Sequence, residues 1–156
     1  MADVTVKRVV NAPVADVWAS WDNFGDIYKF NPNLKSSRLL SGSNDTGRGA
    51  RRQCDMADGK NHILERIIGY TPEKEMVIDI YDGTLPLKSA KATLRFVSTT
   101  NNRTEVSMRM DFVPKMGLLG KMMIPMMKPQ FRKMLQGLVD ANAAFVERGE
   151  EVSLAA

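Results

Sequence analysis

Alternating apolar and polar residues over residues 34–114 constrain the fold of this chain more than any other feature. The alternation is clearest near the end of the stretch, where one face would consist of Thr104, Val106, Met108, Met110 and Phe112. An earlier segment alternates in the same way and would bury Ala90, Ala92, Leu94 and Phe96. Successive side chains of a strand point to opposite faces, so the pattern predicts an antiparallel sheet with one buried and one wet face.

Short polar segments divide this stretch into strands. Residues 43–47 and 98–102 are polar loops, Asp58-Gly59 is a tight-hairpin signal, and residues 71–74 form a turn without strand character. These breaks predict six strands over residues 34–114.

Residues before this stretch predict one more strand and two short helices. Residues 4–10 alternate and form the strand, and Pro13 begins a helix over residues 13–21. Asp22 is expected to cap a second short helix, which Asn31-Pro32 would end because a residue before proline avoids the α region.

After Pro114 the spacing becomes helical. The apolar face would carry Phe131, Met134, Leu135, Leu138, Phe145 and Val146. A helix from Pro129 to Arg148, capped by Gly149, would be roughly 30 Å long. Because an internal proline removes a hydrogen bond, Pro125 and Pro129 predict a separate turn over residues 117–123 and a kink before the main helix.

The order of these elements predicts an α+β fold. With 156 residues, 44% of them hydrophobic, the chain is expected to form a single domain over residues 1–156. The first strand would pair at the far edge of the six, and this seven-stranded antiparallel sheet would curve around the long C-terminal helix. The two short helices would close one end of the groove.

Several short motifs, in this order and spacing, resemble the START-like superfamily, also called SRPBCC. They cover nearly the whole chain and are residues 11–13, 17–18, 28–32, 63–66, 81–86 and 112–114. The superfamily includes the polyketide cyclase/dehydrase group, lipid-transfer domains and pollen-allergen-like ligand binders, and it commonly has tryptophan where this chain has Phe30. The resemblance implies a helix-grip fold with an internal cavity for an apolar ligand. It does not imply one reaction, because this fold carries many functions.

Glu65 and Arg52 are the candidate pair for acid–base chemistry. Glu65 shares a strand face with Ile63 and Ile67, whereas Arg66 falls on the other face, and the pattern leaves open which face is buried. The resemblance favours Glu65 inward, where Arg52 of the neighbouring strand would balance its charge. Such a pair could orient a ligand carbonyl or transfer protons, or it could be a structural or solvent-facing ion pair.

Methionine is concentrated in one part of the chain, with eight of the eleven between Met108 and Met134. Methionine repacks easily around different shapes, so these residues could line a pocket, a pocket mouth or a partner surface, or simply fill the core. The full set of candidate ligand-binding residues is Phe24, Tyr28, Phe30, Arg52, Cys54, Glu65, Ile67, Ile80, Phe96, Met108, Met110, Met123, Met127, Phe131 and Met134.

The segment 115–133 combines methionines with basic residues and no acidic residue. It could make transient contact with an anionic membrane, or it could be the wet face of the helix. The formal charge of +4 is a mild excess without interleaved aromatic residues, so no nucleic-acid partner is expected. No feature of the sequence specifies an oligomeric state.

Cysteine and histidine usage predicts no metal site and no cofactor. Cys54 and His62 are the only residues of their types and would lie on opposite sheet faces, which argues against zinc and against a nucleophile pair. A single cysteine excludes a disulfide framework, and the first residues lack a signal-peptide pattern, so a cytoplasmic location is expected.

These features predict a protein that binds or carries a hydrophobic small molecule, such as a lipid, quinone or polyketide. One alternative is a polyketide cyclase or dehydratase type of enzyme that uses Glu65 and Arg52, helped by Tyr28 or Tyr81. A second alternative is a protein-interaction module that docks through the methionine-rich segment.

Overall fold

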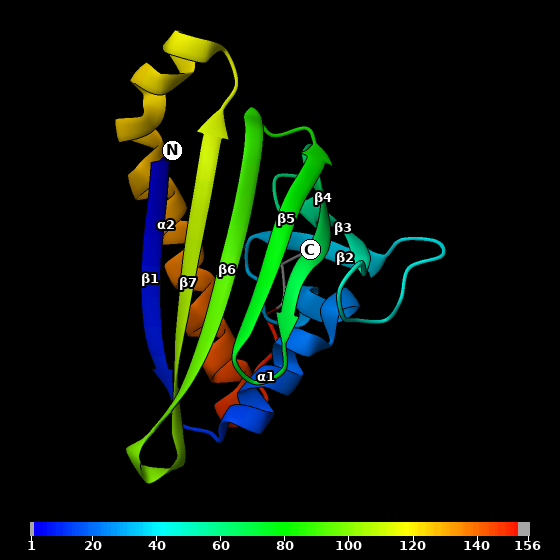
Figure 1. Ribbon diagram of the computed structural model, residues 1–156, viewed down its shortest axis with the longest axis vertical. Helices are drawn as coiled ribbons and strands as arrows, with labels where there is room; N and C mark the ends of the chain where they lie inside the picture. Colours follow the sequence, from blue (N-terminus) through cyan, green and yellow to red (C-terminus); the bar gives the residue numbers. More distant parts are fainter. Residues whose placement is uncertain (1, 153–156) are drawn as a thin grey trace.

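The computed structural model describes residues 2–152 and contains an antiparallel sheet and two α-helices (Figure 1). In chain order the elements are β1 (Ala2–Val10), α1 (Val14–Asp22), η1 (Phe24–Lys29), β2 (Leu34–Leu39), β3 (Arg51–Met56), β4 (His62–Thr71), β5 (Glu75–Gly83), β6 (Leu87–Thr99), η2 (Thr100–Asn102), β7 (Arg103–Pro114) and α2 (Gly117–Arg148). This is the predicted helix-grip fold. Among the residues described, no helix is long and apolar enough to cross a membrane.

The sheet has seven strands in the order β1-β7-β6-β5-β4-β3-β2. β1 pairs with β7, with Val4 opposite Met110, which confirms the predicted pairing of the first strand with the last. The pairings of β2 with β3, β4 with β5 and β6 with β7 contain shifts in register. Such irregularities bend strands, and Figure 1 shows β2 running across the view while β1 and β7 run along it.

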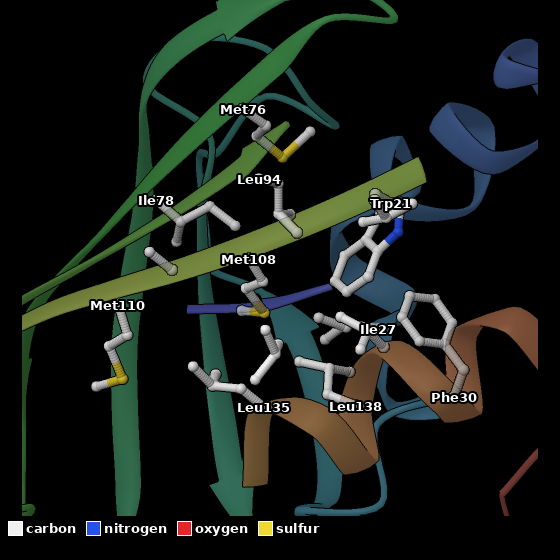
Figure 2. Packing of buried hydrophobic residues seen from close by; sticks show 14 of the residues in the cluster. Trp21, Ile27, Phe30, Met76, Ile78, Leu94, Met108, Met110, Leu135 and Leu138 are labelled. Carbon is white, nitrogen blue, oxygen red and sulfur yellow. The ribbon is translucent and has the colours of Figure 1, made fainter. Parts of the chain in front are cut away.

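The core lies between the concave face of the sheet and α2. Val106, Met108, Met110 and Phe112 of β7 are buried, as their alternation predicted. Figure 2 shows Met108 and Met110 pointing toward Leu135 and Leu138 of α2. Burying a side chain of this size contributes about 1.5–3 kcal/mol, so these contacts hold the helix against the sheet.

Polar and aromatic contacts join the short helices to the end of α2. Trp21 Nε1 donates a hydrogen bond to Asn142 Oδ1 at 3.0 Å, and Asn142 Nδ2 donates to Ser20 Oγ at 2.9 Å. The Phe30 ring lies 5.0 Å from the ring of Trp21 and 5.3 Å from that of Phe145, measured between centroids. The second half of α2 is therefore fixed at its far end.

The predicted start of the long helix was wrong. α2 is continuous from Gly117 and includes both Pro125 and Pro129, where a separate turn and a later start were expected. Both prolines are exposed, so the carbonyl groups that lose their amide donors lie on the water side. Figure 1 shows the first turns of α2 running at an angle to the rest of the helix.

The sequence suggested that Asp22 caps the second short helix, but the structure shows no such cap. It is the last residue of α1, and Asn23 precedes η1 without a side-chain cap. Asp22 Oδ1 instead accepts hydrogen bonds from the hydroxyl groups of Tyr70 and Thr46, each at 2.7 Å. These two bonds tie the end of α1 to β4 and to the loop between β2 and β3.

Candidate functional site

An apolar cavity of about 90 Å³ lies between the sheet and α2. Its lining is Asn31, Asn33, Leu34, Met56, Ile63, Glu65, Ile80, Leu85, Ala92, Met108, Met110, Phe131, Met134, Leu135 and Leu138. Glu65 is the one charged side chain in that lining. The cavity therefore suits an apolar molecule with one polar group.

Glu65 is inward-facing and paired with Arg52, as expected. The register of β3 with β4 places the two residues opposite each other, and Arg52 Nε donates to Glu65 Oε1 at 2.8 Å. The side chains are 3% and 9% exposed. Arg52 Nη1 also donates to the carbonyl of Phe24 at 2.9 Å, and its Cζ lies 3.8 Å from the centroid of the Phe24 ring. These contacts hold the guanidinium rigidly behind the carboxylate.

Cys54 adds a second donor to the same carboxylate oxygen. Its Sγ donates to Glu65 Oε1 at 3.2 Å. Burial, together with the negative charge of Glu65, raises the pKa of the Cys54 thiol well above its ordinary value. The thiol therefore remains protonated, which suits a hydrogen-bond donor and not a nucleophile.

The other oxygen of Glu65 is left for the cavity. Both side-chain donors bond Oε1, and within residues 2–152 no group donates to Oε2. Nearby, Asn31 Oδ1 accepts from the Asn33 amide at 2.9 Å, and Asn33 Nδ2 donates to the Met134 carbonyl at 3.0 Å. The two asparagines thus tie the loop before β2 to α2, and Glu65 Oε2 offers an acceptor to a bound molecule.

The structure brings together six of the fifteen residues that the sequence suggested for ligand binding. The cavity lining contains Glu65, Ile80, Met108, Met110, Phe131 and Met134. The other nine are outside the lining, and they are Phe24, Tyr28, Phe30, Arg52, Cys54, Ile67, Phe96, Met123 and Met127.

Neighbouring contacts explain several of these placements. Phe24 stacks on Arg52, and the Phe96 ring packs 5.2 Å from that of Trp18, measured between centroids. Tyr28 and Met123 are exposed. Tyr81 lies under the guanidinium of Arg66, at 4.8 Å from Cζ to the ring centroid, so neither suggested tyrosine helper reaches Glu65.

Sequence reasoning missed nine lining residues. They are Asn31, Asn33, Leu34, Met56, Ile63, Leu85, Ala92, Leu135 and Leu138. Helical spacing from Phe131 could have identified Leu135 and Leu138. Nothing in the alternation distinguishes a cavity position such as Ala92 from the core position Leu94 on the same strand face.

A second, more polar hollow of about 150 Å³ adjoins the cavity. Both are lined by Ile63, Ile80 and Leu85, so these three side chains form the wall between them. The outer hollow also carries Lys88 and Lys115, the latter just before α2. The cavity and the outer hollow therefore meet at these shared side chains.

Comparison with known proteins identifies the family of the chain. The family model described as polyketide cyclase / dehydrase and lipid transport matches residues 1–142. The chain belongs to this family. Its family and fold support a START-like domain for hydrophobic ligands. No curated protein matches the chain.

Solved structures confirm the fold. A START superfamily protein from Mycobacterium smegmatis is similar with a TM-score of 0.78 and 18% identity, over 94% of this chain and 97% of that one. The protein XoxI from Bacillus cereus is similar with a TM-score of 0.77 and 19% identity, over 96% of this chain and 99% of that one. Truncated norcoclaurine synthase from Thalictrum flavum is similar with a TM-score of 0.72 and 16% identity, over 94% of each chain. These structures confirm the helix-grip fold that the motifs implied, and the family match confirms the polyketide cyclase/dehydrase group.

Proposed function

We propose that this protein binds and carries a small apolar molecule that has one hydrogen-bond donor, such as a phenolic or alcoholic hydroxyl group. The observation that supports this function is the single carboxylate in a mainly apolar cavity, with Glu65 Oε2 left without a donor from residues 2–152. A ligand hydroxyl placed there would make a hydrogen bond to a charged acceptor, which is stronger than one between neutral groups.

The size of the cavity adds a condition to this proposal. About 90 Å³ is less than the roughly 150 Å³ that holds benzene in an engineered cavity. Binding a ring or a longer chain therefore requires the lining to move. Met56, Met108, Met110 and Met134 supply flexible side chains that can change rotamer to admit a ligand.

Two measurements test this function. Native mass spectrometry of protein purified from cells should detect a bound small molecule. In NMR titrations, phenol should bind more tightly than toluene, which has nearly the same shape but no donor. The phenol preference should fall in the variant Glu65→Gln, which keeps the shape of the side chain and loses its charge.

A matched pair of variants locates the binding. Ala92→Ile places extra carbons in the cavity and should weaken phenol binding about tenfold or more, whereas Thr93→Ile on the next, outward position should not. An absence of bound molecules, together with no phenol or toluene binding by the native protein, would exclude the carrier function.

Proton transfer by Glu65 is a second candidate function, favoured by its contact with the cavity. Arg52 and Cys54 hold Oε1, so Oε2 would exchange the proton with a bound substrate. Small molecules that copurify with the native protein would be incubated with it and with Glu65→Gln. Conversion of these molecules by the native protein alone, with binding kept in the variant, would support an enzyme. The absence of conversion would favour the carrier function.

A further inference from the structure

The first part of α2 carries an exposed apolar surface that the cavity does not use. Its most exposed members, with the exposed fraction of each residue, are Leu118 at 77%, Met122 at 71%, Met116 at 68% and Met126 at 67%. Side chains of this kind are normally buried, and here they cluster within three turns of one helix. A contiguous apolar patch of this kind marks an interaction site.

The same segment is strongly basic. It contains Lys115, Lys121, Lys128, Arg132 and Lys133, and no acidic residue lies between Asp111 and Asp140. None of these five forms an ion pair with another residue of the described chain, and the segment itself contains no carboxylate that could balance them. Their positive charge is therefore available to an external partner.

Helix geometry places the two kinds of residue side by side. At about 100° per residue, Leu118, Met122 and Met126 form one row along the helix. Lys121, Lys128 and Arg132 form a neighbouring row, while the buried Gly120 lies on the opposite side of the helix from the apolar row. We call this combination the Leu-Met-basic surface. It consists of Lys115, Met116, Leu118, Lys121, Met122, Met126, Lys128, Arg132 and Lys133.

We propose that the Leu-Met-basic surface docks on an anionic lipid membrane. Amphipathic helices that lie in a membrane interface insert apolar side chains at the boundary of the headgroups and hold lipid phosphates with lysine and arginine. The unbalanced charge selects an anionic surface, and flexible methionines adapt to one. Lys115 belongs both to this surface and to the outer hollow, so docking would bring the outer hollow, which adjoins the cavity, close to the lipid.

Vesicle co-sedimentation of the whole chain tests the docking. Vesicles of phosphatidylcholine mixed with phosphatidylserine should bind the protein, and vesicles of phosphatidylcholine alone should bind it far more weakly. Added salt should reduce binding to the mixed vesicles because it screens the charges. This measurement needs no ligand, so its outcome is independent of the proposed carrier function.

Charge-reversal variants with a matched control locate the surface. Each basic residue near an anionic membrane strengthens binding about fivefold, so Lys121→Glu/Arg132→Glu/Lys133→Glu should reduce the partition coefficient about a hundredfold or more. The control Lys35→Glu/Lys60→Glu/Lys91→Glu changes the net charge equally at exposed positions elsewhere and should have a much smaller effect. Circular dichroism would verify that both variants are folded.

The apolar contribution is tested separately. Leu118→Ser/Met122→Ser/Met126→Ser should reduce binding to mixed vesicles about tenfold or more, and the control Ile68→Ser/Val97→Ser on the outer sheet face should not. Failure of the native protein to bind mixed vesicles would overturn the proposal. Equal losses in the charge-reversal variant and its control would also overturn it, because binding would then depend on net charge alone. Equal losses in the two serine variants would overturn it too, because the apolar side chains of this surface would then have no specific part in binding.

Discussion

Glu65 makes the cavity polar at one point and also balances the buried charge of Arg52. We expect Glu65→Ala to lower the free energy of unfolding by about 3–5 kcal/mol, because it leaves a guanidinium buried without its carboxylate. The double variant Arg52→Met/Glu65→Met should lose considerably less free energy of unfolding, since it removes both charges and fills their space with apolar side chains. Urea denaturation of this double variant and of the single variants Arg52→Met and Glu65→Met gives the coupling energy.

The exposed pair of Arg66 and Asp79 is a suitable control for this measurement. Its atoms are 2.9 Å apart, but the Arg66 side chain is 48% exposed. Asp79→Ala should therefore cost no more than about 1 kcal/mol. A loss of similar size for Glu65→Ala would contradict the burial of an uncompensated charge.

Asp55 should make stability depend on pH in the acid range. Hydrogen bonds from Gln53, and then Arg38, lower the pKa of its carboxyl group from an ordinary 3.8 to about 2. Because the pKa is lower in the folded protein, the stabilisation is complete above pH 4 and disappears as the pH falls toward 2. Asp55→Asn should cost about 1 kcal/mol at pH 6, and its difference from the native protein should vanish near pH 2.

The strand pattern alone did not determine which face of β4 is buried, and the family resemblance favoured Glu65 inward. Once Glu65 was placed inside, its charge required a partner, and Arg52 on the adjacent strand was the candidate that the structure confirms. Asn31 and Asn33 could not be predicted, because their places depend on how the loop before β2 meets α2. Contacts between elements distant in sequence leave no periodic signal.

The first half of α2 lacks several of the hydrogen bonds that stabilise a regular helix. Pro125 and Pro129 donate no backbone hydrogen bond, and Met116 precedes the helix with a φ of 73° and no side-chain cap. We expect Pro125→Ala/Pro129→Ala to slow amide hydrogen exchange over residues 117–130, because two missing bonds can form. Hydrogen–deuterium exchange with mass spectrometry measures this effect.

Exchange over residues 135–146 is the internal control for that experiment. This part of α2 contains the buried residues Leu138 and Val139 and the hydrogen-bonded Asn142, so it should exchange at the native rate in the variant. Unchanged exchange over residues 117–130 would show that the prolines do not loosen the helix. Slower phenol uptake by the same variant would connect this looseness to ligand access.

The strands were more predictable than the long helix, for a physical reason. Gly59, with a φ of 71°, and the turn at residues 71–74 fix where chain direction reverses, and alternation fixes which residues face the core. The effect of a proline in a helix, by contrast, is not determined by its neighbours in the sequence. Whether it ends the helix or bends it depends on whether the lost hydrogen bonds face water, which the sequence around Pro125 does not determine.

The space that the whole molecule leaves between its sheet and α2 is small, at about 90 Å³. The same order of elements could surround a large cavity or none, because the volume depends on how side chains from β4 to β7 meet those of α2. Met108, Met110 and Met134 line this space, and Figure 2 shows the first two. The fold therefore determines where a ligand can bind, and these side chains determine how large it can be.

Enlarging this space should trade stability for binding. Met110→Ala should lower the free energy of unfolding by about 2–5 kcal/mol and tighten phenol binding several-fold, because the ligand then fills a cavity that already exists. Met76→Ala removes an equally buried methionine outside the lining and should show the stability loss without the gain in affinity. Denaturant unfolding and NMR titration of both variants measure the two effects. Equal affinities would mean that ligands enter without using the space beside Met110, and the carrier function would then need another site.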